Sequence, residues 1–164
     1  MKTWVFLLLL VVATGLQYVL PQVWAPLRFM DFILILTFHA ATRSTPLQSV
    51  WRGWLAGLAH DLTLSPFYPL GIQATTKMAA GFLSSLACRR INMDHPALQS
   101  LFVFVLACAN NLAVVGLFVI FGQTCPAQSL TPLLLGAAAT ACGNVVVRML
   151  IVRPPADLFE VEQP

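Results

Sequence analysis

Apolar residues recur along this chain in runs that are long enough to form membrane-crossing helices. A helix needs about 20 apolar residues, within a range of about 17–25, to cross the hydrocarbon core of a bilayer. Prolines and short polar stretches separate the runs. The pattern predicts an all-α membrane protein with six transmembrane helices, at about Trp4–Leu20, Phe29–Ala41, Leu47–Leu64, Leu70–Cys88, Leu98–Phe121 and Leu130–Val152.

The first two runs need separate comment. The first resembles a secretory leader, but Pro21 and Gln22 follow it in place of a small-residue cleavage site, so we interpret it as the first span. The second run, Phe29–Ala41, is short for a bilayer and contains Asp31. We expect it either to borrow residues 26–28 or to be shielded from lipid by its neighbours.

Three charged residues lie inside otherwise apolar sequence between Trp51 and Gly81, namely Arg52, Asp61 and Lys77. An ionisable residue inside a bilayer costs about 2.5–3.5 kcal/mol on insertion scales, so it normally has a partner or a function. Asp61 lies near the end of the third predicted helix and Lys77 near the start of the fourth, so their depths differ by about one turn. One hypothesis is an Asp61–Lys77 pair. The other is that Asp61 lies among the headgroups while Lys77 extends toward the interface.

A tight outer turn is expected between these two helices. Pro66 and Pro69 fix the backbone there, and Gly71 allows close backbone approach where the next helix begins. Together with Arg52, Gly57, Asp61 and Lys77, these residues form the candidate structural or partner-binding set.

The composition agrees with a chain embedded in a membrane. Hydrophobic residues make up 59% of the 164 residues and charged residues 9%, whereas soluble domains carry roughly 25% charged residues. We expect one six-span domain over residues 1–153 and a short cytoplasmic tail over residues 154–164. The net charge of +3 is not gathered into a basic stripe, so nucleic-acid binding is not expected.

The basic residues predict the orientation in the membrane. With the N-terminus inside, seven basic residues lie in inner segments and only Arg28 lies in an outer one, while Lys77 lies within a span. Cytoplasmic loops carry an excess of Lys and Arg, so both termini are expected in the cytoplasm.

Two further patterns lie in the last two spans. The fifth carries Asn110 and Asn111, and the sixth carries small residues four apart, such as Ala137 with Ala141. Small residues let helices approach closely, and amides hydrogen-bond across helices. Helix packing is the favoured interpretation, and a pocket for a polar solute is the alternative.

No catalytic or metal-binding pattern is present in the sequence. His60 and Asp61 are neighbours, so on a helix they point about 100° apart and do not form a dyad. The four cysteines show no metal-ligand spacing to one another or to histidine. Signature motifs for metalloproteases, α/β-hydrolases and nucleotide-binding loops are missing. We therefore expect a protein that is not an enzyme and that binds no cofactor or metal.

The central stretch resembles the MreD family of bacterial rod-shape-determining membrane proteins. The matching residues are Arg52-Gly53, Gly57-Leu58, Asp61-Leu62, Ser65-Pro66 and Pro69-Leu70-Gly71, with a helix to Gly81 and the basic pair Arg89-Arg90 after them. The layout of spans is similar over essentially the whole chain.

This resemblance implies a non-catalytic inner-membrane component of the cell-elongation (rod) complex, which controls cell shape and lateral peptidoglycan synthesis. The expected partners are MreC and, through it, the glycosyltransferase RodA, its transpeptidase partner and MreB, as well as membrane lipid; self-association stays open. The family implies a compact bundle similar to the substrate-binding subunits of energy-coupling-factor transporters. The alternative function is therefore a subunit of an importer that binds a vitamin-like small molecule, although the first span lacks the Ala-rich docking motif of such subunits.

Overall fold

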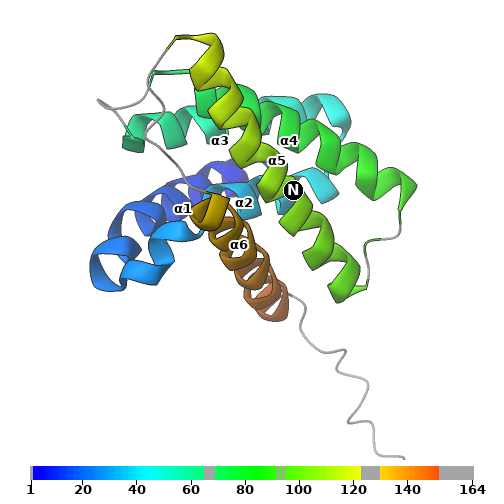
Figure 1. Cartoon of the computed structure of the whole chain (residues 1–164). Coiled ribbons are helices and arrows are strands. Elements are labelled where there is room, and N and C mark those ends of the chain that lie inside the picture. Colours follow the sequence, from blue (N-terminus) through cyan, green and yellow to red (C-terminus); the bar gives the residue numbers. More distant parts are fainter. Residues whose placement is uncertain (1, 65–68, 92, 94, 123–129, 152–164) are drawn as a thin grey trace, which may run out of the picture.

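A computed structural model describes residues 2–64, 69–91, 93, 95–122 and 130–151, and within these residues it contains helices and no strands (Figure 1). The elements are α1 (Thr3–Val23), the 3-10 helix η1 (Ala25–Phe29), α2 (Phe32–Thr42), α3 (Pro46–Leu64), α4 (Ile72–Arg90), α5 (Pro96–Ile120) and α6 (Leu130–Ile151). Each predicted helix therefore has a counterpart in the structure. The predicted tail, residues 154–164, lies outside the described residues.

The largest differences from the prediction are at the first two helices. α1 continues through Pro21 to Val23. Proline has no backbone N–H and so removes one helical hydrogen bond, but Pro21 lies in the last turn, where the helix ends soon afterwards. Residues 25–29 form η1 in place of an extension of α2, and Asp31 then starts α2 by accepting a hydrogen bond from the Leu34 N–H. The short helix α2 therefore borrows no residues from the preceding segment.

The shielding that was the other expectation for this helix is confirmed. α2 has 11 residues, of which seven are buried. At about 1.5 Å per residue it is about 16 Å long, about half of the ~30 Å hydrocarbon core. It contacts each of the other five α-helices, so protein surrounds it where lipid would otherwise do so.

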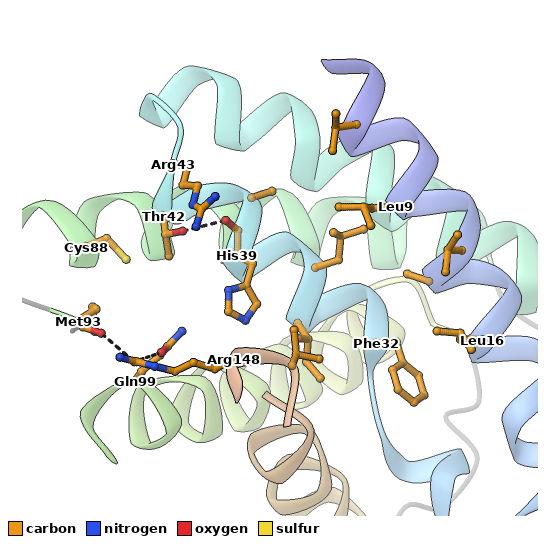
Figure 2. Close-up of a pocket in the computed structure, with 17 residues that line it drawn as sticks. Leu9, Leu16, Phe32, His39, Thr42, Arg43, Cys88, Met93, Gln99 and Arg148 are labelled. Atoms are coloured by element: carbon orange, nitrogen blue, oxygen red, sulfur yellow. Dashed lines mark hydrogen bonds between the residues drawn. The ribbon is translucent and has the colours of Figure 1, made fainter. Parts of the chain in front are cut away.

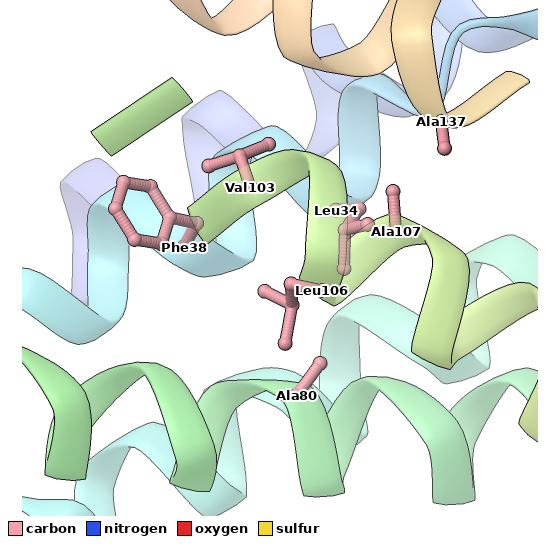
Figure 3. Close-up of a cluster of buried hydrophobic side chains, with 7 residues drawn as sticks. All are labelled: Leu34, Phe38, Ala80, Val103, Leu106, Ala107 and Ala137. Atoms are coloured by element: carbon pink, nitrogen blue, oxygen red, sulfur yellow. The ribbon is translucent and has the colours of Figure 1, made fainter. Parts of the chain in front are cut away.

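Two hydrophobic clusters pack against α2. Figure 3 shows the first, in which Leu34 and Phe38 of α2 meet side chains of α4, α5 and α6. The residues from the other three helices are Ala80, Val103, Leu106, Ala107 and Ala137. The second cluster joins α2 to Phe6 of α1 and Ala56 of α3. The shortest helix is thus the one around which the bundle is packed.

Within the described part of the chain, three of the six predicted spans are helices long and apolar enough to cross a membrane: α1, α5 and residues Thr131–Met149 of α6. α1 has only three buried residues, and it exposes large apolar side chains such as Trp4 and Val11. An apolar surface of this extent suits a lipid environment better than water. The structure therefore supports an all-α membrane protein.

Candidate functional site: a buried polar cluster

The buried carboxylate of Asp61 closes the start of the neighbouring helix α4. It accepts hydrogen bonds from the backbone N–H groups of Gly71 (2.8 Å), Gln73 (3.0 Å) and Ala74 (3.1 Å). The first N–H groups of a helix have no partner within the helix, and the positive end of its dipole attracts an anion. Gly71 occupies the N-cap position and has no side chain to serve as a cap. Asp61 supplies the cap from α3 instead.

The hypothesis of an Asp61–Lys77 ion pair is wrong. The ammonium group of Lys77, which is completely buried, forms its ion pair with Asp31 at the start of α2. Asp61 already has three backbone donors, and Lys77 projects toward α2. The expectation that Lys77 extends to the interface is also wrong, because its side chain ends inside the bundle.

Lys77 is the centre of a polar cluster to which several helices contribute. Its ammonium group lies 3.5 Å from Oε1 of Gln73 and 3.4 Å from Oδ1 of Asn110, in addition to its contact with Asp31. The backbone N–H of Asp31 donates to Oγ1 of Thr140 on α6 at 3.1 Å. The cluster therefore connects α2, α4, α5 and α6 at one level of the bundle.

α1 joins this level through Gln17. Its side-chain amide donates to the Met30 carbonyl (3.0 Å) and accepts from the Phe32 N–H (2.9 Å). These bonds satisfy backbone groups on both sides of Asp31, where the chain leaves η1 and enters α2. Gln17 therefore fixes the non-helical backbone that positions the partner of Lys77.

His60 directly precedes Asp61 on α3 and is also buried. It is 7% exposed. Among the residues that the structure describes, no group of three or more histidine, cysteine, aspartate or glutamate side chains could hold a metal ion.

Glycines bring α3 and α4 into backbone contact. A Cβ at Gly53 would lie 2.3 Å from the Lys77 carbonyl oxygen, and one at Gly57 would lie 2.3 Å from the Ala74 Cα. Gly53 and Gly57 are four residues apart, a spacing that places both on one helix face and permits close helix approach. The sequence analysis noted small residues four apart in the helix that is α6. It did not note that Gly53 and Gly57 have the same spacing in α3.

The turn between α3 and α4 is described in part. Pro66 lies outside the described residues, whereas Pro69 directly precedes the turn that leads into α4. Gly71 has a φ of +103°, in the left-handed region that favours glycine, and a Cβ there would meet no atom within 4 Å. The expected close backbone approach at Gly71 is therefore wrong, and the backbone conformation accounts for glycine at this position.

Arg52 lies at the opposite end of α3 from Asp61 and is 9% exposed. Its guanidinium group donates to the hydroxyl of Ser44 and lies 5.7 Å from the centre of the Phe6 ring. Ser85 of α4 donates to the Ser44 carbonyl at 3.3 Å. Arg52 thus connects α1, α3 and the loop after α2.

In the fifth and sixth helices, the packing interpretation is supported. The Asn111 side chain donates across to the Leu133 carbonyl at 3.3 Å. Ala137 and Thr140 of α6 are buried. Asn110, in contrast, takes part in the Lys77 cluster.

Asp31, Gln17 and Asn110 were not among the candidate site residues. For Asp31, the sequence did indicate a possible partner, Lys77. It directly precedes the second helix, and Lys77 lies early in the fourth. Both helices begin on the same side of an alternating bundle, and a lysine on a helix extends toward the helix N-terminus. By depth in the bundle, Asp31 is therefore as suitable a partner for Lys77 as Asp61 is.

Comparisons with known proteins add no relative. No protein-family model, no curated protein and no solved structure matches the chain. The resemblance to the MreD family therefore rests on the motifs of the central stretch and on the layout of the predicted spans.

Proposed function

We propose that this chain is a non-catalytic inner-membrane scaffold of the bacterial rod complex, which binds MreC and, through it, RodA, its transpeptidase partner and MreB. The observation that supports the scaffold role is that the buried charged side chains interact with other helices of the bundle. Asp61 caps α4, and Lys77 pairs with Asp31. Neither Asp61 nor Lys77 lines the cavity of about 660 Å³ that the bundle contains. The buried charges hold helices together, which is what a docking platform needs.

The resemblance over residues 52–81 directs this proposal to the rod complex. The residues that carry it are also those that join α3 to α4: Gly53 and Gly57 make the close contact, and Asp61 receives the N–H of Gly71. A scaffold that depends on one helical hairpin would require these residue types at these positions.

A six-span arrangement with both termini in the cytoplasm completes the proposal. α3 and α4 have 19 residues each, which corresponds to about 28 Å at about 1.5 Å per residue and matches the ~30 Å hydrocarbon core. Their polar residues, such as Arg52 and Lys77, are buried and need not contact lipid. Arg89, Arg90 and Arg148 lie in the last turns of α4 and α6, consistent with one basic end.

The alternative is a small-molecule-binding subunit of an importer, and the cavity of about 660 Å³ is the observation that favours it. Such a subunit would associate with paired ATPases. A scaffold of the rod complex would associate with MreC.

Depletion of the protein in the bacterium that encodes it tests the proposal. We expect rod-shaped cells to become round, and re-expression of the chain to restore rods. A Gly116→Ala variant should restore them equally well, because a Cβ at Gly116 meets no atom within 4 Å. Cells that keep their shape but come to require an added vitamin would instead support the importer.

A further inference from the structure

The cavity of about 660 Å³ lies between α1 and α2 and extends to the end of α6 and the start of α5 (Figure 2). One end of the cavity is apolar and the other is polar. Apolar side chains of α1, from Val5 to Leu16, form one wall, and Phe32 of α2 lies beside the far end of that wall. Arg43 and Arg148 lie at the other end of the cavity. The space is therefore amphipathic along its length.

The polar end carries positive charge. It contains Arg43, Arg148, Gln99 and His39, and among the described residues that line the cavity none is an aspartate or glutamate. Arg148 donates to the Met93 carbonyl (3.3 Å) and to the side-chain oxygen of Gln99, so its guanidinium group has a defined position. Guanidinium groups form charge-assisted hydrogen bonds with phosphate oxygens.

The apolar end has the length of an acyl chain in one leaflet. Val5 and Leu16 are 11 residues apart on α1, which is about 16 Å at about 1.5 Å per residue. Half of the ~30 Å hydrocarbon core is about 15 Å. A ligand with its anionic group at Arg43 and Arg148 would therefore place one apolar chain along α1 as far as Leu16.

The location of the polar end fits the same ligand. The end of α2, the end of α6 and the start of α5 meet there, and the proposed topology places these ends at the cytoplasmic surface. Anionic lipids are concentrated in that leaflet, and basic pockets between helices bind their headgroups.

We propose that this cavity binds an anionic phospholipid of the cytoplasmic leaflet, with the phosphate at Arg43 and Arg148 and one acyl chain in the groove along α1. The site is separate from the Asp31–Lys77 cluster. The inference goes beyond the scaffold role and does not depend on MreC, although it uses the proposed orientation to name the leaflet.

Native mass spectrometry of the full-length chain in detergent, titrated with phosphatidylglycerol or phosphatidylcholine, tests this site. We expect phosphatidylglycerol to bind in preference. Arg43→Gln should weaken its binding by about fivefold, since a basic residue near an anionic headgroup contributes an effect of that order. Arg89→Gln is the matched control, because Arg89 is exposed at the end of α4 and does not line the cavity. Its binding of phosphatidylglycerol should match that of the wild-type chain.

A second variant tests the acyl-chain end. Leu9 lines the cavity and is 38% exposed, so Leu9→Trp should fill the groove without disturbing a buried position. We expect it to reduce phosphatidylglycerol binding while Arg43 is intact. Inorganic phosphate serves as the probe for the headgroup alone and should compete weakly. The proposal is overturned if phosphatidylcholine binds equally well, if Arg89→Gln acts like Arg43→Gln, if Leu9→Trp has no effect, or if phosphate alone competes fully.

Discussion

At the scale of single residues, the two buried charged side chains Asp61 and Lys77 are stabilised by different kinds of partner. Asp61 is satisfied by backbone N–H groups at a helix start, and Lys77 by a carboxylate with two amide oxygens nearby. The sequence identified both residues as exceptional, because they are charged within apolar runs. It did not identify their partners, since partner choice depends on the direction in which each helix face points.

The Lys77–Asp31 pair predicts a specific pattern of rescue. Lys77→Met alone leaves Asp31, whose side chain is 18% exposed, without its cation. Removing one partner of a fully buried pair costs about 3–5 kcal/mol, and the partial exposure of Asp31 reduces that cost. Asp31→Asn alone leaves Lys77 unpaired but keeps an oxygen for the cap of α2. The double variant should be more stable than either single variant, as measured by thermal unfolding in detergent.

The exchange Asp61→Lys with Lys77→Asp serves as the comparison in the same experiment. It should fail, because a lysine at position 61 cannot accept the three N–H groups of α4. Recovery of stability by this exchange, with no rescue in the Asp31/Lys77 double variant, would contradict the pairing that the structure shows.

Asp61 predicts a separate loss. Asp61→Asn replaces one acceptor oxygen by a donor that faces the N–H groups of α4, so we expect a loss of about 1–3 kcal/mol in the free energy of unfolding. Thr75→Ala, at an exposed position where the hydroxyl donates to the Gly71 carbonyl, is the control and should change stability little. Equal stability of Asp61→Asn and the wild-type chain would show that the cap contributes nothing.

At the scale of elements, the hairpin of α3 and α4 and the short helix α2 organise the bundle. The lengths of the apolar runs predicted where the helices lie, because hydrophobic length and proline breaks are local properties. The shielding of α2 from lipid was expected only as one of two alternatives, and its central position was not predicted. Its 11 residues need shielding, but which helices provide it depends on contacts between segments far apart in the sequence.

The close approach of α3 and α4 predicts that small changes there are severe. Gly57→Ala adds a methyl group that would lie 2.3 Å from backbone atoms of α4, which cannot move independently of the helix. Overpacking of this kind typically costs about 1–3 kcal/mol. The yield of folded protein and its unfolding temperature should both decrease. Gly116→Ala, in open space, should leave both unchanged, and equal behaviour of the two variants would contradict the close packing.

At the scale of the whole molecule, the sequence was sufficient for the all-α fold class, and in the described residues three of the six predicted spans are helices of membrane-spanning length and apolarity. It was not sufficient for the polar interior, because Asp31, Gln17 and Asn110 gain their roles only when α1, α2, α4 and α5 are brought together. The positions of the basic residues, in contrast, give an orientation that is directly testable.

Reporter fusions at the two termini measure that orientation. Both should report the cytoplasm, and a fusion at Cys125, in the segment 123–129 outside the described residues, should report the periplasm. A fusion at Arg43, which follows α2, provides an internal control and should also report the cytoplasm. A periplasmic signal at either terminus would contradict the six-span arrangement.

Affinity capture of the full-length chain from detergent-solubilised membranes, followed by mass spectrometry, tests the proposed scaffold role most directly. An unrelated multi-pass membrane protein with the same tag and similar abundance is the control. The proposal predicts that MreC is enriched over this control, with RodA and its transpeptidase partner present at lower levels. Enrichment of paired ATPases in the absence of MreC would contradict it.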